Sequence, residues 1–242
     1  MEEKQAMDVQ DNSSSAFFAR SAAILGNDAM ERLAAARIAV FGVGGVGGWC
    51  AEALVRTGVG RLAIVDGDTV APSNVNRQVM ATSSTVGRPK AEVLAERLRE
   101  INPSAEIRAF SQRFDAGSAE FFSGEISGCS CAIDAIDSVA DKAALIRLCC
   151  SLGVPVFSSM GAALRLDPTR IRVSRFAKVQ GDGLARALRI RFKKDGQGPV
   201  PDFLCVHSEE TPLSIPERGS LMPVTATFGM VLASLAIRAI CG

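Results

Sequence analysis

The chain has 242 residues, with 27 Lys and Arg against 26 Asp and Glu, which gives a formal net charge of +1. Its composition, 48% hydrophobic and 22% charged, is typical of a globular protein and excludes extensive disorder. Seven cysteines without a Cys-x-x-Cys pair exclude a zinc ribbon and a thioredoxin-like motif, so we expect no structural zinc. Residues 1–15 carry no apolar leader, and we expect them to form a disordered tail on a cytoplasmic protein with reduced thiols.

The first part of the chain alternates between two hydrophobic periodicities. Short apolar runs bounded by turn residues predict buried strands, and apolar residues three or four positions apart predict helices. We expect helices at 28–36, 46–57, 90–101 and 140–151, and strands at 38–41, 62–65, 107–110, 132–134 and 154–157. Strands that alternate with helices of this length form βαβ units. The predicted fold class is therefore α/β: a Rossmann-like, mostly parallel sheet with helices on both faces.

The pattern changes after residue 160. Apolar residues at 164–166 and 171–173 flank the turn Asp167-Pro168-Thr169, which predicts a hairpin, and residues 184–194 predict a helix. We therefore expect the C-terminal part to add an antiparallel extension to the sheet.

A long uncharged stretch comes near the C-terminus. Residues 219–237 contain no charge, and a stretch of this length approaches that of a membrane span. Pro223 and several hydroxyl side chains interrupt it, so the plausible helix is confined to 224–240. A helix buried against a sheet is equally apolar, and we favour that interpretation over a membrane anchor.

A glycine cluster follows the first predicted strand and opens the next helix. It spans residues 42–48 and contains Gly-x-Gly-x-x-Gly. Glycines let the backbone approach a polyphosphate, and the free amides of the helix start attract its charge. Asp66 ends the next strand, where a carboxylate can bind ribose hydroxyls. The cluster predicts a nucleotide site and does not separate NAD from ATP.

The loop after Asp66 favours a triphosphate. Asn74, Asn76, Arg77 and Gln78 offer several hydrogen-bond donors, and Lys90 opens a helix further on. A guanidinium and an ammonium group directed at one crevice form a cationic clamp for phosphates. Hydride transfer has no use for such a clamp at this place.

Two carboxylates end a later strand, at the carboxyl edge where open α/β sheets bind ligands. Asp134 and Asp137 are separated by two residues. Mg²⁺ prefers carboxylate and phosphate oxygens, so two carboxylates at this edge suit a magnesium site. For Asp134 we expect a structural role.

Positive charge is concentrated in one segment. Residues 165–194 hold ten Lys and Arg against two Asp, so the other 212 residues are net negative. A solvated helix face normally mixes both signs, whereas a phosphate-binding surface does not. We therefore divide one ATP-binding domain, residues 16–242, into a nucleotide-binding half (16–160) and a basic, substrate-binding half (161–242).

Together these segments resemble the ubiquitin-activating-enzyme-like adenylyltransferase superfamily. The resemblance covers about residues 18–240 and rests on the glycine turn, Asp66-Gly67-Asp68, and residues 74–78, 85–90 and 134–138. Within the superfamily the chain is most similar to the tRNA threonylcarbamoyladenosine dehydratases, above all over residues 132–145. The molybdopterin and thiamin types usually carry a four-cysteine zinc site, which this sequence lacks.

The resemblance implies an ATP-dependent, adenylating enzyme that uses Mg²⁺. It implies a homodimer, because Arg20 matches an arginine that reaches the partner subunit's ATP site. The implied catalytic residues are Arg77, Lys90, Asp137 and Arg20, with Asp137 as the implied ligand of the Mg²⁺ that accompanies ATP. The implied ATP contacts are Gly42, Gly44, Gly45, Gly47, Asp66, Asp68, Asn74, Asn76, Arg77, Gln78 and Lys90. The implied tRNA contacts are Arg186, Arg189, Arg191, Lys193 and Lys194.

The implied reaction is the ATP-dependent dehydration of threonylcarbamoyladenosine next to the tRNA anticodon. The threonyl carboxylate would be adenylated, and the carbamoyl group would then close on it. A cysteine-desulfurase or sulfur-acceptor system is a further partner that the resemblance allows. Some relatives place a cysteine before the last helix, but residues 219–223 contain none. Cys205 is then a distant candidate for a covalent step, and we favour the alternative that it is a buried apolar residue on a strand.

Other functions remain open at this point. An adenylyltransferase for the C-terminus of a ubiquitin-like sulfur carrier would keep the ATP residues, but it usually has a transfer cysteine or a zinc site. An NAD-dependent oxidoreductase is supported by the glycine turn and Asp66 alone. A non-catalytic scaffold is disfavoured by Arg77, Lys90 and Asp137.

Overall fold

The structure is a computed structural model that describes residues 16–217 and 219–242. The predicted tail at residues 1–15 lies outside these described residues. The helices are α2 (Ala19–Leu25), α3 (Asn27–Ala35), α4 (Gly47–Thr57), α5 (Lys90–Ile101), α6 (Ala119–Ile126), α7 (Val139–Ser151), α8 (Gly183–Asp195) and α9 (Met222–Cys241). The strands are β1 (Arg37–Phe41), β2 (Arg61–Val65), β3 (Glu106–Phe110), β4 (Cys131–Asp134), β5 (Val156–Ser159), β6 (Ile171–Arg175) and β7 (Leu204–Ser208).

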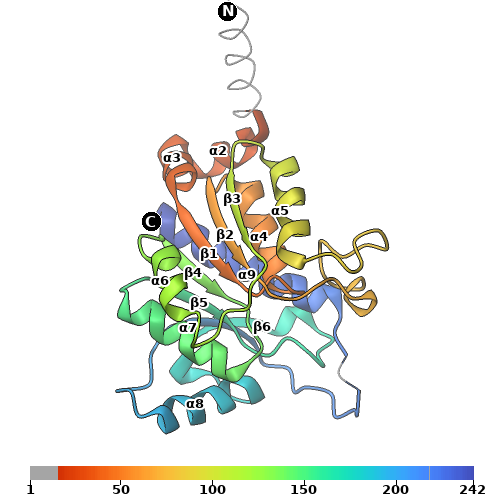
Figure 1. Cartoon of the computed structure of the whole chain (residues 1–242), viewed down its shortest axis with the longest axis vertical. Coiled ribbons are helices and arrows are strands. Elements are labelled where there is room, and N and C mark those ends of the chain that lie inside the picture. The colour runs from red at the N-terminus through yellow and green to blue at the C-terminus, as the bar shows by residue number, and fades with distance from the viewer. Residues whose placement is uncertain (1–15, 218) are drawn as a thin grey trace, which may run out of the picture.

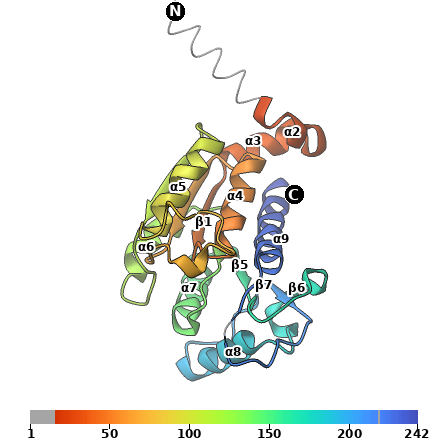
Figure 2. The same ribbon diagram turned by 90° about the vertical axis from the view of Figure 1, so that its right-hand side faces the viewer.

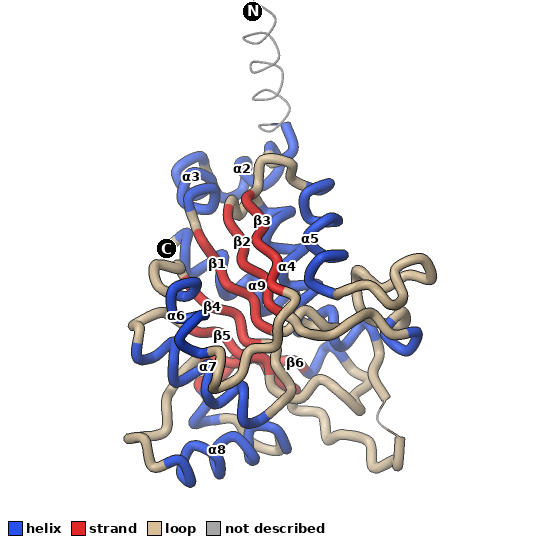
Figure 3. The backbone as a smooth tube through the Cα atoms, viewed as in Figure 1, coloured by secondary structure: helices blue, strands red, loops and turns tan. Residues whose placement is uncertain are grey.

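The seven strands form one sheet in the order β3-β2-β1-β4-β5-β7-β6 (Figures 1 and 3). All neighbours are parallel except β6 and β7, which are antiparallel. This confirms the predicted α/β, Rossmann-like sheet with an antiparallel extension. The predicted hairpin is wrong: residues 164–166 form no strand, and β6 pairs with β7 instead.

Helices cover both faces of the sheet and create two cores (Figure 2). On one face Ile38 and Val40 of β1 pack with α4, α5 and α9. On the other face Ala39 and Phe41 pack with α6, α7 and α8. Consecutive strand residues point to opposite faces, and both faces are covered at β1 and β2, which explains their unbroken apolar runs at residues 38–41 and 62–65.

The apolar C-terminal helix α9 is long and apolar enough to cross a membrane by length and composition, and half of its most apolar window is buried. It packs along α4, where a Cβ on Gly229 would lie 2.4 Å from the Val46 carbonyl oxygen. Phe228 and Leu232 are fully buried in the core on that side. The packing agrees with the expected core helix.

Candidate active site at the carboxyl edge of the sheet

The strand order creates a crevice between the carboxyl ends of β1 and β4. The chain proceeds from β1 outward through β2 to β3 and then returns to β4 on the other side of β1. At such a reversal the two connections diverge and leave room for a ligand. Three segments begin at this edge (Figure 1): the glycine cluster after β1, the segment after β2, and the Asp134–Asp137 segment after β4.

The glycine loop is packed too tightly for side chains. Gly42 has a φ of +81°, and a Cβ on it would lie 2.8 Å from the Ala135 carbonyl oxygen. A Cβ on Gly47 would lie 1.9 Å from the carbonyl oxygen of Gly42. Above the loop, a Cβ on Gly45 would meet Arg77 Cγ at 3.2 Å and Thr225 Oγ1 at 3.3 Å. The loop therefore brings backbone amides, the Arg77 loop and the first turn of α9 together.

Asp66 holds the start of the loop in place. Its Oδ2 accepts a hydrogen bond from Val43 N at 2.8 Å, and its Oδ1 accepts one from Asp68 N at 2.9 Å. Burial raises the pKa of Asp66 above its usual value, against the lowering effect of these amide donors and of Lys90. The carboxylate is thus positioned from two sides at the end of β2.

A short antiparallel contact places Lys90 beside the segment that follows Asp66. Thr69 bridges Pro89, and the Lys90 amide donates to the Asp68 carbonyl oxygen at 3.0 Å. Lys90 Nζ then lies 2.8 Å from Asp68 Oδ2. The Lys90 side chain is 8% exposed, whereas that of Asp68 is 75% exposed. The Lys90 side chain is therefore nearly buried, whereas its partner Asp68 is in contact with solvent.

The guanidinium of Arg77 uses only some of its hydrogen-bond donors within the described part of the chain. Its carbonyl oxygen accepts from Trp49 Nε1 at 3.0 Å, which ties its loop to α4. Its Nη1 donates to the Ser73 carbonyl oxygen at 2.8 Å and to Asn76 Oδ1 at 2.9 Å. Within the described residues no partner is found for its Nε or Nη2, so part of the guanidinium fork is available to a ligand.

The neighbouring amide side chains have different roles. Asn74 Oδ1 accepts from the Ala71 amide at 3.0 Å and shapes the turn. Asn76 Nδ2 donates to the Ser220 carbonyl oxygen at 3.0 Å and links this loop to the segment before α9. Gln78 is buried beside Gly44, and its Oε1 has no partner among the described residues. Gln78 is therefore the amide with a free acceptor.

The two carboxylates after β4 have different environments, as expected. Asp134 is fully buried, and its Oδ2 lies 2.6 Å from Lys142 Nζ and from Ser158 Oγ. Its Oδ1 accepts from the Ile136 amide at 3.1 Å, which shapes the turn that leads to Asp137. Asp137 is exposed at the edge of the crevice. Asp134 thus has a structural role, and Asp137 remains the candidate for a metal ion.

Sequence reasoning missed three residues of this site. Lys142 is completely buried against Asp134 although its position on α7 resembles that of a surface lysine. Arg113 pairs with Asp141 at 2.6 Å, and this pair raises the pKa of Arg113, with smaller contributions from the charges of Asp68 and Asp137. Thr225 lies against Gly45 in the first turn of α9. No local sequence signal separates these residues from ordinary helix and loop positions.

Arg20 lies far from this crevice in its own chain. It is exposed on α2, and the adjacent Phe18 lies 3.7 Å from a Cβ on Gly58, just after α4 ends. The glycine loop lies at the other end of α4, which has 11 residues. At about 1.5 Å per residue, the helix separates the two places by about 16 Å. Figures 1 and 2 both show α2 at the end of the molecule opposite α8.

The basic segment is less uniform than its sequence suggests. Arg186, Arg191, Lys193 and Lys194 are exposed on α8, although Arg191 pairs with Asp195 at 2.8 Å. Arg189 is half-buried: it donates to the carbonyl oxygens of Phe176 and Val179, and its guanidinium lies 4.9 Å from the centre of the Phe176 ring. The structure therefore gives Arg189 a packing role.

Two further residues correct or support the sequence interpretation. Arg165 was counted in the basic surface, and this is wrong, because it is 2% exposed and pairs with Asp182. Cys205 is buried on β7, as expected, and burial raises its pKa to about 12. A thiol with such a pKa stays protonated near neutral pH and is a weak nucleophile.

Among the described residues, no group of three or more His, Cys, Asp or Glu side chains is placed to hold a metal ion. A lone carboxylate such as Asp137 is nevertheless the usual protein contribution to a Mg²⁺ ion carried on nucleotide phosphates.

Comparison with known proteins places this site in a family context. The model of the ThiF family matches residues 18–242. The tRNA threonylcarbamoyladenosine dehydratase of Bacillus subtilis is 38% identical over 200 residues, which is 83% of this chain and 77% of that protein. The Escherichia coli protein of that name is 44% identical over 179 residues, 74% of this chain and 66% of that protein. A crystal structure of the Escherichia coli enzyme in complex with ATP superposes with a TM-score of 0.89 at 40% identity, covering 93% of this chain and 94% of that one.

Proposed function

The chain belongs to the ThiF family, and from that membership we propose that it is an ATP-dependent tRNA threonylcarbamoyladenosine dehydratase. The observation that carries the proposal is the match, along nearly the whole chain, to an enzyme of that name solved with ATP. The crevice supports it, because glycine amides, an arginine and a lysine converge there.

The first step would be adenylylation. A carboxylate oxygen of the threonyl group attacks the α-phosphorus of ATP, and the bond to the bridging oxygen breaks as pyrophosphate leaves. Negative charge accumulates on the departing oxygens. The free donors of Arg77 and the ammonium group of Lys90 would stabilise that charge, while the glycine amides and Asp66 hold the phosphates and ribose.

The second step would need no residue as nucleophile. The carbamoyl group of the same nucleoside attacks the acyl carbon, AMP leaves, and the ring closes. Because both groups belong to one substituent, proximity supplies most of the rate. The net change is the loss of one water from the nucleoside, coupled to cleavage of ATP to AMP and pyrophosphate.

Mg²⁺ and a second subunit complete the proposed site. Asp137 would hold Mg²⁺ together with phosphate oxygens, and the ion supplies neutralising charge for pyrophosphate. Arg20 would serve the site of a partner subunit in a homodimer, since about 16 Å of helix α4 lies between it and its own site. A cytoplasmic location and a sulfur-transfer partner remain part of the proposal.

The proposed RNA surface is the exposed basic face of α8. Its members without an acidic partner in the described structure are Arg186, Lys193 and Lys194. These side chains would contact the phosphate backbone around the anticodon loop and orient the modified adenosine without reading its sequence.

The test is whether ATP consumption depends on the proposed substrate. Release of AMP and pyrophosphate is measured with tRNA that carries threonylcarbamoyladenosine, with the same tRNA lacking it, and with a ubiquitin-like sulfur carrier. We expect release only with the modified tRNA. Release of pyrophosphate with the sulfur carrier alone, with AMP retained on the carrier as an acyl-adenylate, would establish the alternative adenylyltransferase function.

A further inference from the structure

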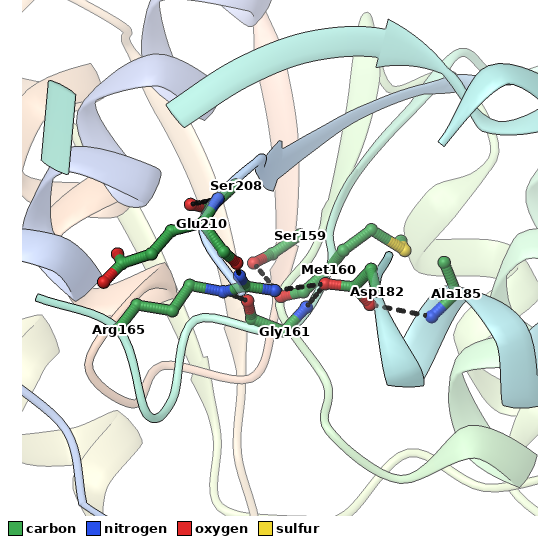
Figure 4. A network of polar contacts seen from close by, with 8 residues as sticks. All are labelled: Ser159, Met160, Gly161, Arg165, Asp182, Ala185, Ser208 and Glu210. Carbon is green, nitrogen blue, oxygen red and sulfur yellow. Dashed lines mark hydrogen bonds and ion pairs between the residues drawn. The ribbon is translucent and has the colours of Figure 1, made fainter. Parts of the chain in front are cut away.

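A buried arginine lies outside the nucleotide crevice and joins three segments of the chain (Figure 4). Arg165 Nε donates to the Gly161 carbonyl oxygen at 2.9 Å, and Nη2 lies 3.0 Å from Asp182 Oδ2. Its Nη1 donates to the Glu210 carbonyl oxygen. The side chains of Arg165 and Asp182 are each 1% exposed. A guanidinium this deeply buried is tolerated only because its fork of donors is matched on several sides.

The aspartate end of this pair fixes the basic helix. Asp182 caps α8 by accepting from the Ala185 amide at 2.9 Å, and its other oxygen accepts from the Gly161 amide at 3.1 Å. Arg165 and Asp182 therefore join the first turn of α8 to the connection after β5. The exposed cations proposed to bind RNA are carried on this same helix.

On the side of Glu210, the contacts hold the segment after β7. The Glu210 carboxylate accepts from the amides of Leu166 and Asp167, each at 3.0 Å. Leu164 has a φ of +60°, a conformation that an L-residue adopts only when its surroundings impose it. Its amide donates to the Gly219 carbonyl oxygen at 2.9 Å, and its carbonyl oxygen accepts from the Leu213 amide at 2.8 Å.

The held segment continues into the nucleotide crevice. The Ser220 carbonyl oxygen accepts from Asn76, in the loop that carries Arg77, and the first turn of α9 then places Thr225 beside Gly45. Residues 210–217 and 219–221 thus extend from the contacts of Arg165 to the loop of the proposed phosphate clamp. One buried side chain is in contact with both the helix proposed to bind RNA and the segment that reaches the ATP loop.

We propose that Arg165 is a positioning residue. Through Asp182 and Glu210 it fixes α8 and the segment after β7 in one arrangement relative to the nucleotide crevice. A carboxylate on an RNA bound along α8 would then meet the α-phosphate at a reproducible distance. The catalytic half of this statement rests on the proposed function, whereas the mechanical half concerns this chain alone.

Two variants test it. In Arg165→Met/Asp182→Asn neither side chain keeps a charge, and the asparagine oxygen can still cap α8, so no unpaired charge is buried. Glu210→Ala keeps the buried pair and the carbonyl oxygen that Arg165 binds, and it removes only the half-buried carboxylate that accepts from the amides of Leu166 and Asp167. The matched control is Arg172→Met, which removes an exposed cation that pairs with Glu209 at 3.3 Å.

The first readout is hydrogen exchange, which needs no activity. We expect the amides of Leu164 and Leu213 to exchange about tenfold faster or more in both test variants and at the wild-type rate in the control. The Val43 amide, bound by Asp66, should not change. The second readout is turnover at saturating ATP and tRNA, which should fall about a hundredfold, whereas the affinity for ATP alone should change by less than about threefold.

Unchanged exchange at Leu164 and Leu213 in Arg165→Met/Asp182→Asn would overturn the proposal. Faster exchange with turnover within about twofold of the wild type would overturn its catalytic half, because misplacement of this kind should be costly. If the wild-type protein does not dehydrate modified tRNA, the proposed function fails, and the exchange rates alone then decide whether Arg165 fixes these segments.

Discussion

Two lysines in this protein make ion pairs of nearly equal length, yet we expect opposite consequences when each is replaced by methionine. Lys90 Nζ lies 2.8 Å from Asp68, and Lys142 Nζ lies 2.6 Å from Asp134. Methionine keeps most of the apolar stem and removes the charge. The difference between the two sites lies in the exposure of the partner carboxylate, which is 75% for Asp68 and 0% for Asp134.

The exposures determine the magnitudes. After Lys90→Met, Asp68 remains solvated, so the loss of unfolding free energy is that of a surface pair, about 0–1 kcal/mol. After Lys142→Met, Asp134 is left as a buried charge without its partner, which costs about 3–5 kcal/mol. For a chain of this length that loss lowers the Tm by about 6–20 °C. Loss of one electrostatic contact to the departing pyrophosphate in Lys90→Met should lower turnover about 100- to 1000-fold.

The assay pairs thermal unfolding with AMP release on modified tRNA. Lys90→Met should unfold close to the wild-type temperature and be nearly inactive, whereas Lys142→Met should be clearly destabilised. Adding Asp134→Asn to Lys142→Met removes the unpaired charge and should recover stability. Turnover above about a tenth of the wild-type value in Lys90→Met, or an equal loss of stability in both single variants, would contradict these roles of the two lysines.

Three further predictions concern other parts of the site. Arg77→Ala should lower turnover about 100- to 1000-fold without changing the unfolding curve, because its free donors serve the ligand; a loss below about tenfold would remove it from the phosphates. Equal mixing of the inactive variants Arg20→Ala and Lys90→Ala, with subunit exchange checked by labelling, should recover up to about a quarter of wild-type activity, since each heterodimer has one complete site; exchange without recovery would contradict a role for Arg20 in the partner's site. The affinity for tRNA should fall as the salt concentration rises. When alanine replaces the exposed cations Arg186, Lys193 and Lys194, the slope of log affinity against log salt concentration should flatten by about 2–3, with the affinity for ATP unchanged. An unchanged slope would exclude this surface.

Much of the fold follows from local sequence patterns. Strands β1 to β5 and helices α4, α5 and α7 lie within a few residues of their predicted positions, because a strand covered on both faces must be apolar throughout and its helices must be amphipathic. Helix α6, between β3 and β4, was not predicted. The prediction of a hairpin at residues 164–173 was wrong for a different reason. Residues 164–166 have the composition of a strand, but Leu164 adopts a left-handed conformation, and the partner of β6 lies beyond α8 at β7. Strand pairing at such separation leaves no local signal.

The nucleotide crevice was more predictable than the RNA face. Glycines, Asp66 and Lys90 follow from the chemistry of phosphates and from the place where parallel strands end. Charge alone could not separate exposed arginines from buried ones. Arg165 has the same formal charge as Arg186, yet the first joins three segments inside the protein and the second faces solvent. The burial of Lys142 was equally invisible, because its partner Asp134 lies on a different element.

The most direct test of the proposed function is mass spectrometry of the nucleosides from tRNA incubated with ATP and this protein. We predict that threonylcarbamoyladenosine is converted to a product lighter by one water, only when ATP is present, and that Lys90→Met does not form it. Unchanged threonylcarbamoyladenosine after incubation with folded wild-type protein and ATP would contradict the proposed function.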